Sequence, residues 1–345
     1  MKITKNIFPL EWKITDPLQV PYHGTKVFGT FVCGGGSTMG YKLAGYEHIG
    51  GVEFTEHYSR AYRANHKPRY FYEQDIRTFN ESQDLPSELY DLDLLDGSPP
   101  CAAFSSAGAG ERLWNKKSSY ENTSQRKDDL VFVYLETVAK LRPKVFLLEN
   151  VQGLIKGNAK AYAKEIVKLG EGMGYKVQLF CLNAASMGLP QIRTRVFFIG
   201  LRNDFDLPKL QMDFDCPLVG FGVTRKYWNN GGYDISHLAI GREYDNTAVG
   251  GNSAKFFNLF KPHPKKPCFT ITEASSNPTA ASVVHPFQKR KLNLDEVRLL
   301  STFPLDYDFA GNNPVSVMGR SVLPCMMANV SHQIFLQWLS KLKPD

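Results

Sequence analysis

One cysteine follows a rigid turn at the end of a predicted buried strand. Leu94 and Leu95 lie in an apolar segment, and Pro99-Pro100 then precedes Cys101. Each proline fixes its own φ and restricts the residue before it, so the backbone ahead of the thiol is stiff. A thiol on such a loop, at the carboxyl end of a strand, is placed to act as a nucleophile. Free cysteines are more often small core residues, so residues elsewhere in the chain must show whether Cys101 is a nucleophile or a core residue.

Acidic and basic side chains occur at two further strand ends. Glu149-Asn150 follows the apolar run 145–148, where burial would raise the pKa of the glutamate and suit it to donate a proton. Arg193 and Arg195 come just before the predicted strand 196–199. Residues at i and i+2 of an extended chain point to the same side, so both guanidinium groups are expected to face one site.

The elements that must position these groups start with a strand at 26–32, which leads into the glycine-rich turn 33–36 and a helix. This order is typical of the first unit of a doubly wound α/β sheet, although the turn does not match GxGxxG. Glu53 ends the second predicted strand, and Asp75 lies near the end of a third, at 70–76. Acids at these positions outline an adenosine pocket, whereas either alone would be a solvated charge or a helix cap.

The composition is that of a globular protein, with 41 basic and 34 acidic residues and a formal charge of +7. The six cysteines form no CxxC pair, which argues against a zinc site or a disulfide framework and favours a reducing compartment. We therefore expect no metal. The sequence shows neither a signal peptide nor an apolar run long enough to cross a bilayer, so a cytoplasmic protein is expected.

The chain divides into four predicted parts: an N-terminal extension at 1–25, a catalytic and cofactor-binding domain at 26–201, a smaller domain at 202–310 and a C-terminal segment at 311–345 that packs back on the catalytic domain. A polar loop at 105–128 carries bases suited to closing over a polyanion. The small domain is expected to consist of short strands and loops with a basic face. That face would include Lys255, Lys261, Lys265, Lys266, Lys289, Arg290 and Lys291.

Taken together, the motifs from about residue 26 to residue 340 resemble the DNA (cytosine-5) methyltransferase family. The motifs that carry this resemblance are the glycine-rich turn after Phe31, Glu53, Asp75-Ile76, Pro99-Pro100-Cys101, Glu149-Asn150-Val151, Gln191-Ile192-Arg193-Thr194-Arg195 and Gly319-Arg320-Ser321-Val322. The resemblance implies a Rossmann-like, S-adenosylmethionine-dependent methyltransferase domain with a smaller target-recognition domain.

The resemblance also assigns roles to individual residues. Catalysis would involve Cys101 as nucleophile, Glu149 as the acid at the cytosine ring, and Arg193 and Arg195 as arginines that hold the base. S-adenosylmethionine would be bound by Phe31, Cys33, Gly35, Gly36, Glu53, Phe54, Asp75, Ile76, Pro99, Leu130, Arg320, Ser321 and Val322. The substrate would contact Pro100, Ser105, Asn150 and Gln191.

Two positions depart from the family pattern. Cys33 stands where glycine is usual, and Arg320 stands where asparagine is usual. Both lie in the predicted cofactor site, and neither changes Cys101 or Glu149. An arginine at 320 cannot make the compact amide contact of asparagine, so the cofactor loop is expected to work differently here.

The resemblance implies double-stranded DNA as the partner of a monomer in a prokaryotic or phage setting, near the nucleoid, with a cognate restriction endonuclease as a further candidate partner. A tRNA cytosine-5 methyltransferase of the same fold and a catalytically silent DNA-binding relative are the alternatives. A nicotinamide-dependent dehydrogenase fits least, because it has no use for Pro-Pro-Cys. The recognised DNA sequence cannot be read from the chain.

Overall fold

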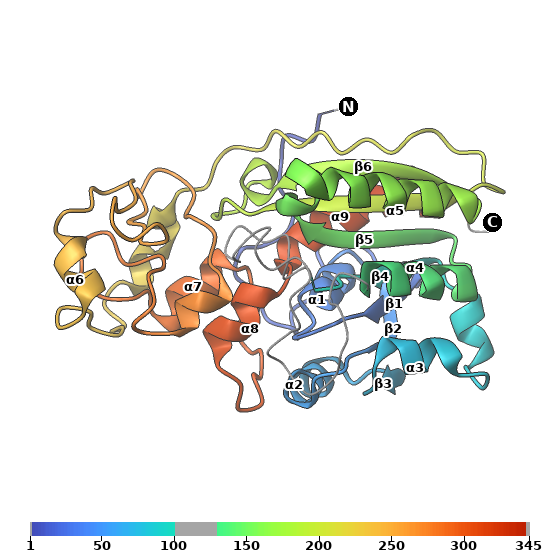
Figure 1. The fold of residues 1–345 in the computed structure, drawn as a ribbon, viewed down its shortest axis with the longest axis horizontal. Coiled ribbons are helices and arrows are strands. Elements are labelled where there is room, and N and C mark those ends of the chain that lie inside the picture. Colours follow the sequence, from blue (N-terminus) through green and yellow to red (C-terminus); the bar gives the residue numbers. More distant parts are fainter. Residues whose placement is uncertain (1, 101–129, 343–345) are drawn as a thin grey trace.

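A computed structural model describes residues 2–100 and 130–342 of the chain. A seven-stranded sheet forms its centre, with helices on both faces (Figure 1). The strands are β1 Lys26–Thr30, β2 Glu47–Val52, β3 Tyr70–Tyr72, β4 Leu94–Gly97, β5 Val145–Val151, β6 Tyr175–Asn183 and β7 Thr194–Arg202. Their order in the sheet is β3-β2-β1-β4-β5-β7-β6. The doubly wound, Rossmann-like α/β fold predicted from the sequence is confirmed.

Strand β7 is the exception to the parallel arrangement. It pairs in antiparallel fashion with β5 on one side and β6 on the other. The amino end of β7 therefore lies at the same edge of the sheet as the carboxyl ends of β1, β2, β4 and β5. This reversal brings the residues that precede β7 to the edge where α/β proteins bind their ligands.

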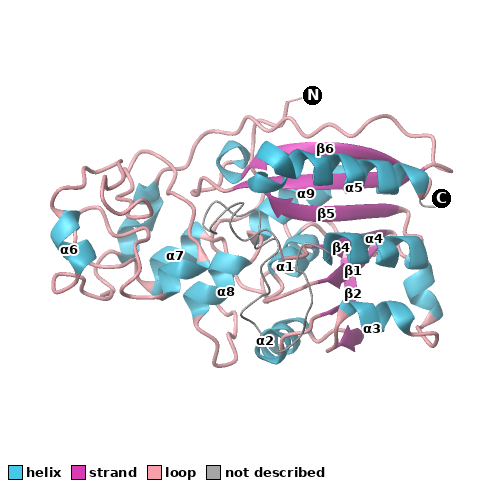
Figure 2. Ribbon diagram, in the orientation of Figure 1, coloured by secondary structure: helices cyan, strands magenta, loops and turns pink. Residues whose placement is uncertain are grey.

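Helices surround the sheet in two layers (Figure 2). The helices are α1 Gly36–Leu43, α2 Glu56–His66, α3 Ile76–Glu81, α4 Leu130–Leu141, α5 Lys160–Gly172, α6 Ala239–Tyr244, α7 Leu294–Leu300, α8 Pro314–Arg320 and α9 Pro324–Gln337. Strand side chains alternate between the layers: Leu147 packs with α1 and α9, whereas Phe146 and Leu148 pack with α4 and α5. The buried apolar run of β5 is explained by this double coverage.

Residues 203–310, the small domain, depart from the expected short strands. Throughout this span, all of it described, the backbone forms isolated bridges, such as Asn252–Phe260, together with short helices. A separate small core lies around α6 and includes Ile235, Ile240 and Leu259. The expectation of strands was wrong because the segment lacks the alternating apolar pattern that a half-buried strand needs.

The predicted basic face of the small domain is also smaller than expected. Lys261, Arg290 and Lys291 are buried. Arg290 donates two 2.8 Å hydrogen bonds to the carboxylate of Glu296, and Lys291 Nζ donates to Ser282 Oγ at 2.7 Å. Lys255, Lys265 and Lys266 are exposed. A run of charges in the sequence therefore contained both surface and core residues.

The N-terminal segment packs against the main hydrophobic core. Phe8 and Trp12 are buried in the main core, and Trp12 Nε1 donates to the carbonyl of Thr302 at 3.0 Å. After β7 the chain leaves at the far edge of the sheet, and residues 203–220 run back along β6 toward the small domain (Figure 1). Gln178 of β6 holds this return segment through two hydrogen bonds to the backbone of Leu210.

Candidate active site

A largely buried ion pair between a glutamate and an arginine lies at the ligand-binding edge of the sheet. Glu149 is the fifth residue of β5, and Arg195 is the second residue of β7. Arg195 Nε lies 2.9 Å from Glu149 Oε1, with the side chains 14% and 9% exposed. Burial raises the pKa of Glu149, while the positive charges of Arg195 and Arg193 act to lower it. A carboxyl group balanced in this way can change its protonation when a ligand enters.

Arg193 has a different environment from Arg195. It precedes β7, is 1% exposed, and donates hydrogen bonds to three backbone carbonyls. The acceptors are Ile271 at 3.0 Å, Gly319 at 3.1 Å and Ser321 at 2.8 Å. The expectation that both arginines face one site stays a prediction: the charges of both act on Glu149, but the Arg193 guanidinium group is bonded to backbone carbonyls. Its geometry favours a positioning role over direct contact with a base.

Gln191 is also placed inside the protein. Its side chain is fully buried, donates to the carbonyl of Leu300 at 3.0 Å, and accepts from the N–H of Ile271 at 3.2 Å. The N–H of Ile192 donates to the carbonyl of Cys268 at 2.7 Å, and the N–H of Cys268 donates to the carbonyl of Pro190 at 2.8 Å. Residues 191–193 thus join the catalytic sheet to the small domain, an arrangement that favours positioning over the predicted substrate contact.

Asn150 fixes the loop that leads to the predicted nucleophile. Its Nδ2 donates to the carbonyl of Pro99 at 3.2 Å, which ties the end of β5 to the turn after β4. Pro99 is buried, and Pro100 is exposed. The predicted site residues Cys101 and Ser105, and the basic loop that follows, lie outside the described residues. The structure therefore defines the surroundings of the nucleophile up to Pro100.

The glycine-rich turn is held by a buried acid. Phe31 and Cys33 have φ of 55° and 47°, the left-handed region that costs non-glycine residues energy. Glu53 Oε2 accepts from the N–H of Cys33 at 2.9 Å, and Oε1 accepts from the N–H of Thr55 at 2.8 Å. Burial raises the pKa of Glu53, while these N–H groups act to lower it. The carboxylate that was predicted to bind ribose hydroxyls also fixes the turn.

The C-terminal motif packs directly on this turn. A Cβ on Gly36 would lie 2.2 Å from the carbonyl of Val322, and Tyr307 donates to the carbonyl of Gly34 at 2.5 Å. Ser321 and Val322 are buried. Arg320 is turned away, with Nη2 2.5 Å from Glu273 Oε1 and its guanidinium carbon 5.8 Å from the centre of the Tyr58 ring. The departure at 320 therefore forms a link to the small domain.

Other predicted cofactor residues surround the same edge. Strand β3 ends at Tyr72, earlier than predicted, and Asp75 caps α3 by accepting the N–H of Arg77 at 2.8 Å. Ile76 is buried, whereas the side chain of Phe54, which follows β2, is 61% exposed. Leu130 begins α4. Because β1, β2 and β3 are parallel neighbours, their following residues lie at one edge.

Sequence reasoning did not identify Asp96 as an unusual group. It lies in β4, 3% exposed, and accepts a 3.1 Å hydrogen bond from the hydroxyl of Tyr41. Asp96 pairs with Leu147, so Glu149, two residues further along β5, lies on the same face of the sheet. Burial raises the pKa of Asp96 to about 8, and the nearby charge of Glu149 adds to this rise. The available signal in the sequence was an acid directly after the apolar pair Leu94-Leu95 and before the end of the predicted strand.

Two classes of feature are absent from the described part of the chain. Among residues 2–100 and 130–342 no three His, Cys, Asp or Glu side chains are grouped to hold a metal ion. Across the same residues, no helix has the length and apolar character required to cross a membrane.

The fold and this edge define an α/β protein of Rossmann-like type with a glycine-rich turn beside a buried glutamate–arginine pair. A sequence model of the family described as C-5 cytosine-specific DNA methylase matches residues 26–336. The chain belongs to this family, and the activity that the family defines is that of a DNA cytosine-5 methyltransferase. The resemblance seen in the motifs is thereby confirmed.

Individual relatives agree with the family assignment. The Type II methyltransferase M.NgoPII of Neisseria gonorrhoeae is 32% identical over 186 residues, which span 54% of this chain and half (50%) of that protein. The Type II methyltransferase M1.HphI of Haemophilus parahaemolyticus is 26% identical over 87% of this chain and 84% of its own length.

Solved structures share the fold. A protein described as a DNA modification methyltransferase encoded within a prophage of E. coli superposes with a TM-score of 0.68 at 18% identity, covering 91% of this chain and 99% of its own. The DNMT2 of Spodoptera frugiperda gives a TM-score of 0.63 at 16% identity, covering 90% of this chain and 100% of its own.

Proposed function

We propose that the protein transfers a methyl group from S-adenosylmethionine to carbon 5 of a cytosine flipped out of duplex DNA, through a covalent bond between Cys101 and carbon 6. The observation that carries this proposal is the buried Glu149–Arg195 pair at 2.9 Å, beside the Asn150–Pro99 hydrogen bond that fixes the approach to Cys101. The match to the C-5 cytosine-specific DNA methylase family and the relatives named Type II methyltransferases support this proposal.

The residues at the sheet edge fit S-adenosylmethionine by the chemistry of their donors and acceptors. Glu53 has carboxylate lone pairs left for ribose hydroxyls, and Phe54 offers an exposed ring for stacking on adenine. Asp75 lies at the amino end of α3, close to the same edge. When bound, the cofactor supplies an electrophilic methyl group on a sulfonium.

The chemistry requires a nucleophile, a proton donor and a base-holding cation. Addition of the Cys101 thiolate to carbon 6 moves electron density onto carbon 5, which then attacks the methyl group. Glu149, when protonated, donates to N3 and stabilises the charge that develops on the ring. Arg195 holds Glu149 in place and offers N–H donors for the carbonyl at carbon 2. Loss of the carbon 5 proton to a base then breaks the carbon–sulfur bond and regenerates the thiolate.

The decisive experiment traps the covalent adduct. Duplex DNA that contains 5-fluorocytosine in place of cytosine is incubated with S-adenosylmethionine and the full chain, then separated under denaturing conditions. The fluorine cannot leave as a proton does, so an active enzyme remains attached to the DNA. We expect a stable complex with the natural chain and none with Cys101→Ala. Absence of a complex on a library of all short sequences that carries 5-fluorocytosine in place of cytosine would contradict the proposal.

A methyl-transfer assay shows whether the substrate is DNA or RNA. Transfer of labelled methyl groups to duplex DNA, compared with tRNA, separates a DNA enzyme from a tRNA enzyme of the same fold. Binding to duplex DNA is expected to weaken steeply as salt increases, because basic side chains release counterions from phosphates. A flat salt dependence would argue against duplex DNA as the substrate.

The setting follows from the relatives. We propose that the protein acts as a monomer on cellular or phage DNA at the nucleoid of a prokaryotic cytoplasm, either as the modification enzyme of a restriction–modification system or as an orphan modification enzyme without a partner nuclease. Bisulfite sequencing of DNA from cells that express the chain would reveal the methylated sequence. Protection of that sequence from a co-encoded endonuclease would identify the partner.

A further inference from the structure

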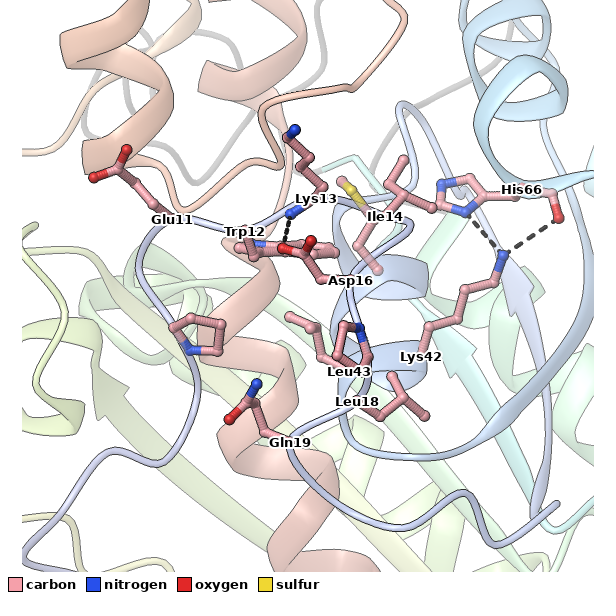
Figure 3. Close-up of a pocket in the computed structure, with 13 residues that line it drawn as sticks. Glu11, Trp12, Lys13, Ile14, Asp16, Leu18, Gln19, Lys42, Leu43 and His66 are labelled. Atoms are coloured by element: carbon pink, nitrogen blue, oxygen red, sulfur yellow. Dashed lines mark hydrogen bonds between the residues drawn. The ribbon is translucent and has the colours of Figure 1, made fainter.

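A second pocket lies behind the glycine-rich turn, between the N-terminal segment and α1. Its volume is about 250 Å³, large enough for a compact organic molecule. Its walls are formed by the N-terminal segment, by α1 and by the last residue of α2, as Figure 3 shows. None of the described residues that were predicted to bind the cofactor or to act in catalysis lines it, so it is separate from the described part of the candidate active site.

One wall of this pocket is polar and cationic. Lys42 Nζ lies 3.3 Å from both His66 Nδ1 and the carbonyl of His66. No described carboxylate forms an ion pair with Lys42, although burial lowers its pKa only to about 8, which leaves it charged at neutral pH. His66 is 7% exposed, and its Nε2 has no hydrogen-bond partner among the described residues. Lys42 is half-buried and has no carboxylate partner among the described residues, so an anion could pair with it.

Part of the remaining lining is apolar, and its two acids, Glu11 and Asp16, already have hydrogen-bond partners. Trp12, Met39 and Leu43 contribute buried apolar surface to the lining. Glu11 accepts from the hydroxyl of Tyr227 at 2.5 Å and lies away from Lys42 (Figure 3), while Asp16 accepts from the N–H of Lys13 at 2.6 Å. These carboxylates disfavour a multiply charged ligand such as a phosphate.

We propose that this pocket binds a small molecule with an apolar, ring-sized body and a single carboxylate. The carboxylate would pair with Lys42, and the body would pack against Trp12, Met39 and Leu43. The proposal gives a role to the N-terminal segment, which the methyltransferase chemistry does not use. A bound ligand would also affect the glycine-rich turn, because His66 of the pocket lies against Gly35. A Cβ on Gly35 would be only 2.2 Å from His66 Nε2.

Calorimetric titration of the full chain with matched acids and amides tests the proposal. The probes are phenylacetate with phenylacetamide, benzoate with benzamide, and indole-3-acetate with its amide. We expect at least one acid to bind, with its amide weaker by about tenfold or more, the loss that corresponds to a hydrogen bond between charged groups. If no acid binds at millimolar concentration, or if acids and amides bind equally, the proposal is overturned.

Variants locate the binding. Lys42→Met should remove the preference for the acid, and Lys42→Arg should restore it. Lys13→Met, a change of the other lysine that lines the pocket, should leave acid binding within about twofold. Leu18→Trp, a change at a residue that is 42% exposed, should fill the pocket and block binding. Acid binding that persists in both Lys42→Met and Leu18→Trp would place the ligand elsewhere and overturn the proposal.

Discussion

Glu149 is held between two opposing influences, burial among apolar residues and contact with a guanidinium group. Burial raises the pKa of Glu149, and the charges of Arg195 and Arg193 act against this rise. For Asp96, on the same face of the sheet, burial raises the pKa to about 8, and the charge of Glu149 adds to the rise. The two acids therefore differ in their environments, and each leads to a separate experiment.

Replacement of Glu149 by glutamine keeps the shape of the side chain and removes its exchangeable proton. We expect Glu149→Gln to slow methyl transfer by about 10²–10⁴-fold, the usual contribution of a general acid. Single-turnover transfer of labelled methyl groups to DNA measures this rate. Glu165→Gln, on the exposed side of α5, is the matched control and should retain full activity. A loss of less than about tenfold in Glu149→Gln would rule out the acid role.

Asp96 makes stability depend on pH. The folded protein keeps this proton up to a pH of about 8, whereas the unfolded carboxyl releases it near a pH of about 4. The unfolded state then binds fewer protons, so the free energy of unfolding falls as pH rises from about 4 to 8, by up to about 1.4 kcal/mol per pH unit. Asp96→Asn should remove this slope and stabilise the protein most at pH 8.

Urea unfolding at several pH values between 5 and 8 measures the difference between Asp96→Asn and the natural chain. Subtraction cancels the titration of other groups, such as the buried His48 and His66, whose pKa values are lowered by burial. Asp84→Asn, at an exposed position, is the control and should give a parallel pH profile. Parallel profiles for Asp96→Asn as well would contradict a buried neutral Asp96.

At the scale of elements, Arg193 and Arg195 are expected to have different roles: Arg193, in the seam 191–193, contributes to stability, and Arg195 contributes to catalysis. Arg193→Met leaves three buried carbonyls without a donor, so we expect it to lower the free energy of unfolding by about 3 kcal/mol or more. Arg195→Met should instead mainly reduce the rate of methyl transfer, because Arg195 contacts Glu149. Urea unfolding and activity, measured on both variants, would show the opposite pattern if the roles were exchanged.

The contact between α1 and the segment after α8 leads to a prediction about cofactor affinity. A Cβ on Gly36 would meet the carbonyl of Val322, a backbone atom that cannot move independently. Gly36→Ala should therefore displace the glycine-rich turn and weaken binding of S-adenosylmethionine by about tenfold or more. Gly172→Ala, at the end of α5 with open space around its Cβ, is the control and should bind normally. Calorimetric titration with the cofactor measures both.

At the scale of the whole molecule, the sequence predicted the sheet and most of its edge for physical reasons. Apolar runs such as 145–148 are buried on both faces and leave little choice of structure, so Glu149 could be placed at the edge from the sequence. The different environments of Arg193 and Arg195 could not be predicted, because they depend on whether the strand begins at 193 or 194. Burial of Lys261, Arg290 and Lys291 depends on partners distant in space, which a charge count does not contain.

The reversed strand β7 determines how the chain reaches the small domain. Because β7 ends at the edge opposite the candidate active site, residues 203–220 must retrace the length of the sheet beside β6, an outer strand. Residues 203–220 therefore connect β7 to the small domain and also cover β6, a nine-residue strand whose free edge could otherwise pair with another molecule. A deletion within residues 203–220 would both shift the small domain and expose the edge of β6 to aggregation, although none of the proposed catalytic residues lies in this segment.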